Sequence, residues 1–181
     1  MAKPKFNLYC KNHKGNKNTM SKNKKQQKTN VMRILSQAKI PYEAHYYDTS
    51  DGDLSGTAVA KKLGEDVASV YKTLVCRAHS GAFYVFVIPV ADSLNLKKAA
   101  SAVGEKSVEM IPQKELLPNT GYIHGGCSPV GMKKPYPTTI HQDAENLPVF
   151  YVSAGKVGAQ VGVNPKTLAE LIGAGFTDLV A

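Results

Sequence analysis

Two long apolar segments separated by four residues constrain the fold of this chain most strongly. Residues 70–78 and 83–90 are rich in Val, Ile, Phe and Tyr, and the connecting residues His79-Ser80-Gly81-Ala82 suit a short turn. Apolar runs on either side of a short glycine-containing turn predict a β-hairpin. Both faces of the first segment are largely apolar, which is typical of a strand covered on two sides. The hairpin is therefore expected inside a layered domain.

Short helices and strands are predicted to alternate along the rest of residues 29–181. Thr29 or Asn30 can cap the first helix, and Pro112 suits the first position of the fourth. Helices are predicted at residues 30–38, 57–63, 95–103, 112–117 and 165–172, and further strands at residues 42–47, 107–111, 138–141, 149–153 and 159–163. This mixture predicts one α/β (α+β) domain built around a mixed β-sheet.

The basic charge of the chain is confined to its first 28 residues. Residues 1–28 hold nine lysines and no acidic residue, whereas residues 29–181 hold 14 basic and 14 acidic residues. The formal charge of +9 therefore belongs to an extension and not to the domain. Because the extension is rich in Lys and Asn and lacks periodic apolar residues, we expect it to be disordered.

Two interpretations of residues 1–28 remain open. The segment is a basic arm attracted to nucleic-acid phosphates, or it precedes the true start, because Met20 opens a compact second beginning. The second interpretation is favoured, and it predicts that residues 1–19 can be removed without loss of folding or activity. Cys10 and His13 have the spacing of half a zinc site, but the sequence has no second half, so no metal is expected.

Cysteine usage and hydropathy favour a cytoplasmic protein. Cys10, Cys76 and Cys127 are scattered and odd in number, which favours reduced thiols over a disulfide framework. No apolar run approaches the roughly 20 residues of a membrane span, and the amino terminus lacks the apolar segment of a secretory signal. We therefore expect a cytoplasmic location and no contact with a membrane.

The glycine-rich segment Thr120–Gly131 is the first candidate for a catalytic loop. Its sequence, TGYIHGGCSPVG, holds four glycines and one proline in twelve residues. Glycine allows positive φ and close approach of a ligand to the backbone, and successive N–H groups in such a turn can bind an oxyanion. A tight irregular turn without chemistry is the alternative interpretation.

Lys72 is the second candidate, because its ammonium group lies in a strand with two apolar faces. Such a group is paired, reaches outward to solvent, or enters a polar pocket, and the sequence leaves these possibilities open. In a pocket it would hold a carbonyl, a phosphate or a thiolate. Thr73 points to the opposite face in a regular strand, so both side chains reach one ligand only near a strand end or a bulge.

Cys127 and Ser153 lie in or beside the glycine-containing segments. Cys127 follows His124 by three residues, but a cysteine nucleophile rarely finds its histidine within one loop, so Cys127 is interpreted as a packing residue. Ser153 precedes a second glycine stretch, and its hydroxyl reaches the same site if the two segments lie side by side. Neither segment has the glycine spacing of a phosphate loop or a dinucleotide-binding loop.

Five ordered motifs make the chain similar to the YbaK family of free-standing aminoacyl-tRNA deacylases. They are VAKKLG at 59–64, VYKTLV at 70–75, VIPVADSLNLKKAASAVGEKSVEMI at 87–111, TGYIHGGCSPVGMKK at 120–134 and YVSAGKVG at 151–158. The resemblance covers nearly all of residues 29–181 and is closest to the Cys-tRNA(Pro) deacylases. It implies the fold of the editing domain inserted in bacterial prolyl-tRNA synthetases, a barrel-like mixed sheet flanked by helices.

The resemblance also implies roles for individual residues. The implied catalytic groups are Lys72 and the first glycine of the GG pair, Gly125, and the implied substrate-binding residues are Tyr46, Thr73, Gly126 and Ser153. The sequence departs from the family at two places. Gln160 stands where some relatives carry an acid, and none of Leu54, Ser55 and Gly56 matches an aromatic pocket residue of the family.

The activity implied by the resemblance is removal of cysteine from Cys-tRNA(Pro), and with it from Cys-tRNA(Cys). The thiol of the substrate attacks its own ester carbonyl, while the protein confines the substrate and needs neither a metal nor an organic cofactor. Aminoacyl-tRNA and, transiently, prolyl-tRNA synthetase are the implied partners. Two alternatives remain, which are an Ala-tRNA(Pro) deacylase of the same fold and a non-catalytic module that binds tRNA or a synthetase.

Overall fold

Residues 27–181 are described by a computed structural model and contain five α-helices, eight β-strands and two short 3₁₀ helices. Residues 1–26, with the expectations for the basic extension and for Cys10 and His13, lie outside the described part. No helix in the described part is long and apolar enough to cross a bilayer.

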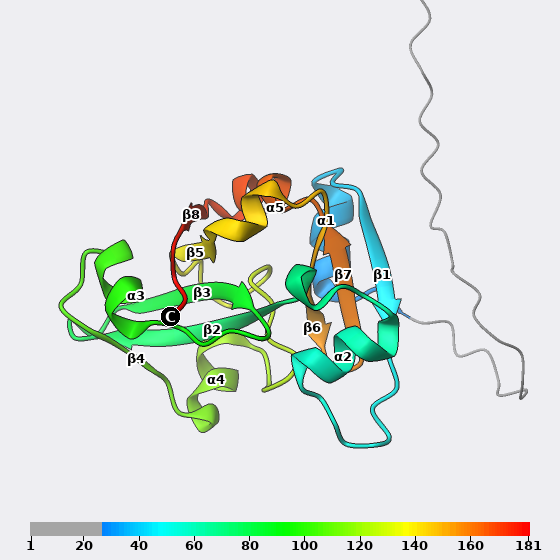
Figure 1. Cartoon of the computed structure of the whole chain (residues 1–181), viewed down its shortest axis with the longest axis horizontal. Coiled ribbons are helices and arrows are strands. Elements are labelled where there is room, and N and C mark those ends of the chain that lie inside the picture. The colour runs from blue at the N-terminus through cyan, green and yellow to red at the C-terminus, as the bar shows by residue number, and fades with distance from the viewer. Residues whose placement is uncertain (1–26) are drawn as a thin grey trace, which may run out of the picture.

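The strands of the described part form two sheets, one upright on the right of Figure 1 and one on its left. The first sheet is antiparallel, in the order β1 (Tyr42–Tyr46), β7 (Ala159–Val163) and β6 (Phe150–Lys156). The second is mixed, in the order β4 (Val108–Met110), β2 (Tyr71–Ala78), β3 (Phe83–Pro89), β5 (Thr138–His141) and β8 (Gly175–Thr177). The predicted hairpin of β2 and β3 is confirmed.

The two sheets meet at the start of β2. Strand β4 pairs only with residues 76–78 of β2, so the edge of β2 before Val75 is not covered by β4. Val70, just before β2, instead forms a single parallel bridge with Tyr151 of β6. The predicted α/β fold with a mixed sheet flanked by helices is confirmed, with its strands divided between two sheets that touch at this corner.

Four of the five described helices begin at a residue whose side chain caps the first turn. The five helices are α1 (Asn30–Gln37), α2 (Gly56–Leu63), α3 (Leu96–Ala102), α4 (Gln113–Thr120) and α5 (Pro165–Ile172). The Thr29 hydroxyl accepts from the Met32 amide at the start of α1, and Gly64 adopts a φ of 67° at the end of α2. Helix α1 buries Val31, Met32 and Leu35 in the larger core, which fills the space between the sheets.

The predicted bounds of α4 are wrong. Helix α4 was expected to begin at Pro112 and end near Leu117, but Pro112 is its N-cap and the helix continues through Pro118. Side chains support this last turn, because the Thr120 hydroxyl and the Asn119 amide donate to the backbone carbonyls four residues earlier at 2.7 and 2.8 Å.

Strand β6 was expected to end at Ser153 but continues to Lys156. The register against β7 shifts between these two residues, which marks a β-bulge. Gly155 lies in this bulge with a φ of +89°, a conformation that favours glycine. The second glycine stretch is therefore part of a bulged strand and of the turn that follows it.

Candidate functional site

A pocket of about 350 Å³ opens at the corner where the two sheets meet. Its walls come from the start of β2, from Val90 after β3, from the segment before α2, from the glycine loop and from β6 and β7. Four of the six residues assigned to the site from the sequence line it, namely Lys72, Thr73, Gly125 and Ser153. Segments far apart in the sequence thus converge on one cavity.

Tyr46 and Gly126 are not among the residues that line this pocket. The Tyr46 hydroxyl donates to the Met32 sulfur of α1 at 3.9 Å, and Tyr47, the next residue, lines the pocket instead. The Gly126 amide donates to the Ile123 carbonyl at 3.0 Å within the loop. Gly126 thus lies in the glycine loop without lining the pocket, and Tyr46 packs against the core.

The glycine loop and the β6–β7 turn lie side by side, which is the condition under which Ser153 was expected to reach the site. A Cβ atom at Gly126 would lie 3.1 Å from the Val157 nitrogen and 3.2 Å from the Lys156 carbonyl carbon. Since both neighbours are backbone atoms, a side chain at this position would require the β6–β7 turn to shift by a few tenths of an ångström. The loop is braced further by the Tyr122 hydroxyl, which donates to the Val130 carbonyl at 2.5 Å.

Gly125 lines the pocket with backbone atoms alone, because it has no side chain. Its φ of +81° lies in the left-handed region, where glycine is unstrained. Among residues 27–181 no hydrogen-bond acceptor is found for its amide, in contrast to the Gly126 amide next to it. A backbone N–H that borders a pocket without a partner is the group that stabilises an oxyanion.

Lys72 is fixed at the pocket wall by main-chain carbonyls. Its Nζ donates to the carbonyl oxygens of Val90 at 3.1 Å and Asp92 at 2.6 Å. An ammonium group has three N–H donors, so one remains for a ligand. Burial lowers the pKa of Lys72, and the nearby Asp92 carboxylate partly opposes this effect. Of the possibilities left open by the sequence, a lysine at a polar pocket is the one observed.

Three hydroxyl groups add to the polar wall. The Thr73 and Tyr71 hydroxyls are buried and have no hydrogen-bond partner among the described residues. Such groups are costly unless a ligand or water completes them. The Ser153 hydroxyl accepts from the Gly155 amide at 3.2 Å, which leaves its own proton to donate. Lys72 and Thr73 both line the pocket because it lies at the start of β2, where the strand edge is open.

Cys127 lines the same pocket but is not an activated nucleophile. Burial raises the pKa of its thiol to about 12, so the reactive thiolate is strongly disfavoured. Among the described residues no hydrogen bond joins His124 to Cys127. The predicted packing role of Cys127 agrees with its 8% exposure. The site therefore offers hydrogen-bond donors and a positive charge, and not an attacking group.

The structure adds pocket residues that sequence reasoning missed. Leu54 lines the pocket, and its Cδ1 would lie 3.7 Å from a Cβ atom at Gly125. An aliphatic side chain therefore stands in the segment where the family pattern led us to expect an aromatic one. Gln160, to which no role was assigned, also lines the pocket and is 4% exposed.

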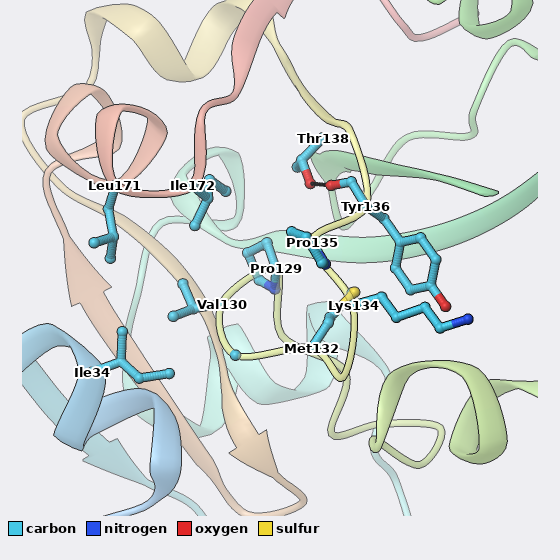
Figure 2. A pocket seen from close by; sticks show the side chains of 11 residues that line it. Ile34, Pro129, Val130, Met132, Lys134, Pro135, Tyr136, Thr138, Leu171 and Ile172 are labelled. Atoms are coloured by element: carbon cyan, nitrogen blue, oxygen red, sulfur yellow. Dashed lines mark hydrogen bonds between the residues drawn. The ribbon is translucent and has the colours of Figure 1, made fainter. Parts of the chain in front are cut away.

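A second cavity of about 310 Å³ lies between α1, residues 129–138 and α5 (Figure 2). Ile34, Val130, Leu171 and Ile172 give it apolar walls, and the Lys134 side chain extends beside Tyr136 at one end. The Thr138 hydroxyl is already bonded to the Tyr136 carbonyl at 3.0 Å. None of the six residues assigned from the sequence lines this cavity, so the pocket at Lys72 is the candidate site.

The protein thus has a fold of two sheets and a pocket that lies beside the GG loop and is lined by hydrogen-bond donors. The family described as the aminoacyl-tRNA editing domain matches residues 54–171, and the chain belongs to this family. This range contains Lys72, Thr73, Gly125 and Ser153. It also confirms the resemblance found from the five sequence motifs.

The chain is also similar to individual proteins, one of them by sequence and two by solved structure. The chain is 42% identical over 160 residues to EbsC of Enterococcus faecalis, which is named as a Cys-tRNA(Pro)/Cys-tRNA(Cys) deacylase, with 88% of this chain and 98% of the relative covered. A solved structure described as a trans-editing enzyme for prolyl-tRNA synthetase is 26% identical, with a TM-score of 0.72, and 83% of this chain and 94% of that chain are covered. The hypothetical protein APE2540 shares the fold, with a TM-score of 0.76 at 22% identity over 83% of this chain and 99% of that chain.

Proposed function

We propose that this protein deacylates Cys-tRNA(Pro), and with it Cys-tRNA(Cys), at the pocket beside Lys72. The observation that carries the proposal is that the Lys72 ammonium and the unpartnered Gly125 amide border one cavity. The family and the name of the 42% identical relative support this choice of substrate.

The chemistry is an attack within the substrate. The cysteine sulfur forms a bond to the ester carbonyl carbon, and the bond from that carbon to the ribose oxygen of the terminal adenosine breaks. The thiol proton ends on the ribose oxygen, so tRNA leaves with a free hydroxyl and cysteine leaves as a cyclic thiolactone. Water then opens the thiolactone to cysteine. This scheme needs no protein nucleophile, in agreement with the raised pKa of Cys127.

The protein contributes geometry and electrostatics. A well-oriented intramolecular attack gains about 7–11 kcal/mol from confinement. The Gly125 amide and the remaining Lys72 donor would stabilise the oxyanion that develops on the carbonyl oxygen, at about 2.7–4 kcal/mol for a single donor. The Ser153 and Thr73 hydroxyls would bind the ribose or the amino acid.

A deacylation assay on purified protein tests the proposal. We expect release of cysteine from Cys-tRNA(Pro), a much slower reaction with Ser-tRNA, and loss of activity in Lys72→Ala without unfolding. Equal rates with the cysteinyl and seryl esters would refute attack by the substrate thiol. Preference for Ala-tRNA(Pro) would favour the same-fold alternative, and binding without turnover would favour the non-catalytic module.

Delivery of the substrate is proposed to involve prolyl-tRNA synthetase in the cytoplasm, where tRNA is charged. Residues 29–181 carry no formal net charge, so the domain lacks the excess of basic residues that holds tRNA phosphates tightly. A synthetase that releases mischarged tRNA nearby would compensate for weak binding. Added synthetase should raise kcat/KM for Cys-tRNA(Pro), and an unchanged kcat/KM would refute this part of the proposal.

A further inference from the structure

Three polar residues form a row across the first sheet, and its inner end reaches the pocket. His45 of β1 lies opposite Gln160 of β7, and Gln160 lies opposite Ser153 of β6. Directly opposite residues share one face of a sheet, so the three side chains project the same way. Gln160 and Ser153 line the pocket, while His45 lies outside it.

Glu65 is held beneath this row by the end of α2. The left-handed Gly64 ends the helix, and the Glu65 amide donates back to the Ala60 carbonyl at 2.9 Å. The Glu65 side chain is 4% exposed, and one carboxylate oxygen accepts from the Gln160 amide nitrogen. The other carboxylate oxygen lies 2.7 Å from His45 Nδ1. A buried carboxylate is thus paired on both sides.

The pairing with Glu65 fixes which way the Gln160 amide faces. An ionised carboxylate only accepts hydrogen bonds, so the NH₂ end of the amide must face Glu65. The hydrogen bond from His45 to Glu65 raises the pKa of His45, burial partly opposes this, and the nearby Glu43 carboxylate raises it further. The side-chain carbonyl oxygen of Gln160, Oε1, has no hydrogen-bond partner among the described residues. Gln160 is part of the pocket wall.

We propose that Glu65, supported by His45, is a positioning residue that holds the Gln160 carbonyl oxygen toward the pocket, where it accepts a hydrogen bond from the α-ammonium group of the aminoacyl ester. This inference rests on the proposed function, because it names the contact of that substrate's amino group. A cation held by Gln160 on one wall leaves the ester carbonyl to Lys72 and Gly125 on the other.

A substrate without the amino group tests the contact. The 3-mercaptopropionyl ester of the same tRNA keeps the thiol and the ester and lacks only the α-ammonium group. Because the α-ammonium group also activates the ester carbonyl, each kcat/KM is divided by the uncatalysed cleavage rate of the same ester. For the wild type we expect this corrected kcat/KM to be about 10- to 100-fold higher with the cysteinyl ester, the range of one hydrogen bond to a charged group. In Gln160→Met the corrected ratio should fall close to one. In Glu65→Gln it should fall part of the way, because the amide can then face either direction.

A matched control removes a paired carboxylate elsewhere. Asp178 bonds the Lys98 ammonium at 2.6 Å and does not line the pocket, so Asp178→Asn should keep the wild-type ratio. Circular dichroism identifies variants that fail to fold. If Glu65→Gln does not fold, His45→Gln tests the same positioning role. A folded Gln160→Met with the wild-type ratio would overturn the inference. A wild type inactive on both esters would instead refute the proposed function.

Discussion

Replacement of Lys72 by methionine should separate catalysis from stability. Lys72 uses two of its three N–H donors on the Val90 and Asp92 carbonyls, so one donor is left for the reacting ester. Loss of a single oxyanion donor costs about 2.7–4 kcal/mol, or roughly 100- to 1000-fold in kcat. We therefore expect Lys72→Met to lower kcat for Cys-tRNA(Pro) by that factor.

The same substitution should leave the fold nearly as stable as before. Burial lowers the pKa of Lys72, so the ammonium is less favourable in the folded protein than in water, and methionine removes this penalty. The two carbonyls lose their donor, at about 0.5–1.5 kcal/mol for each net hydrogen bond. The effects oppose each other, so urea unfolding should give a free energy within about 1.5 kcal/mol of the wild type.

A matched lysine provides the control for Lys72→Met. Lys98 also donates to a carbonyl, that of Val180 at 2.8 Å, and it does not line the pocket. Lys98→Met should keep the wild-type kcat in steady-state deacylation. If Lys72→Met retained kcat within fivefold of Lys98→Met, the assignment of Lys72 to the reacting ester would be refuted.

Three further predictions concern the loop contact, pH and the extension. Gly126→Ala places a Cβ atom 3.1 Å from the Val157 nitrogen, and we expect a loss of about 1–3 kcal/mol of unfolding free energy in a urea titration; an unchanged value would contradict the close contact. The raised pKa of His45 adds stability that is fully present below pH 6.5 and is lost as pH rises through the raised value. The difference in unfolding free energy between the wild type and His45→Gln, measured in urea, should therefore shrink above pH 6.5. Removal of residues 1–19 should leave thermal unfolding and deacylation unchanged, and a large loss of activity would favour the basic-arm interpretation.

Local patterns predicted most of the fold. Helix caps such as Thr29, strand alternation and the four-residue turn after β2 act over a few residues, so the elements that they define could be located without tertiary information. The end of α4 could not be predicted, because side-chain bonds from Thr120 and Asn119 sustain a turn that Pro118 would otherwise interrupt. The short strand β8 was missed, because only its parallel pairing with β5 makes it a strand.

Some residues of the site could likewise be predicted from the sequence, and others could not. Residue type and motif pointed to Lys72, Thr73, Gly125 and Ser153, since a lysine in an apolar strand and glycines in a tight loop are unusual whatever surrounds them. The exchange of Tyr46 for Tyr47 at the pocket depends on where β1 ends and on which face each side chain takes. Nothing in the sequence could supply that register.

The sequence by itself determined the order of the five helices and of the first seven strands, the confinement of the net basic charge to residues 1–28, and the family. The tertiary structure alone decided that β4 stops short on β2, which leaves an open strand edge where the two sheets meet and where the pocket forms. It also decided that Glu65, His45 and Gln160 become one hydrogen-bonded group. The physical reason is that contacts between residues 20 and 95 positions apart depend on how the sheets pack, which no local pattern encodes.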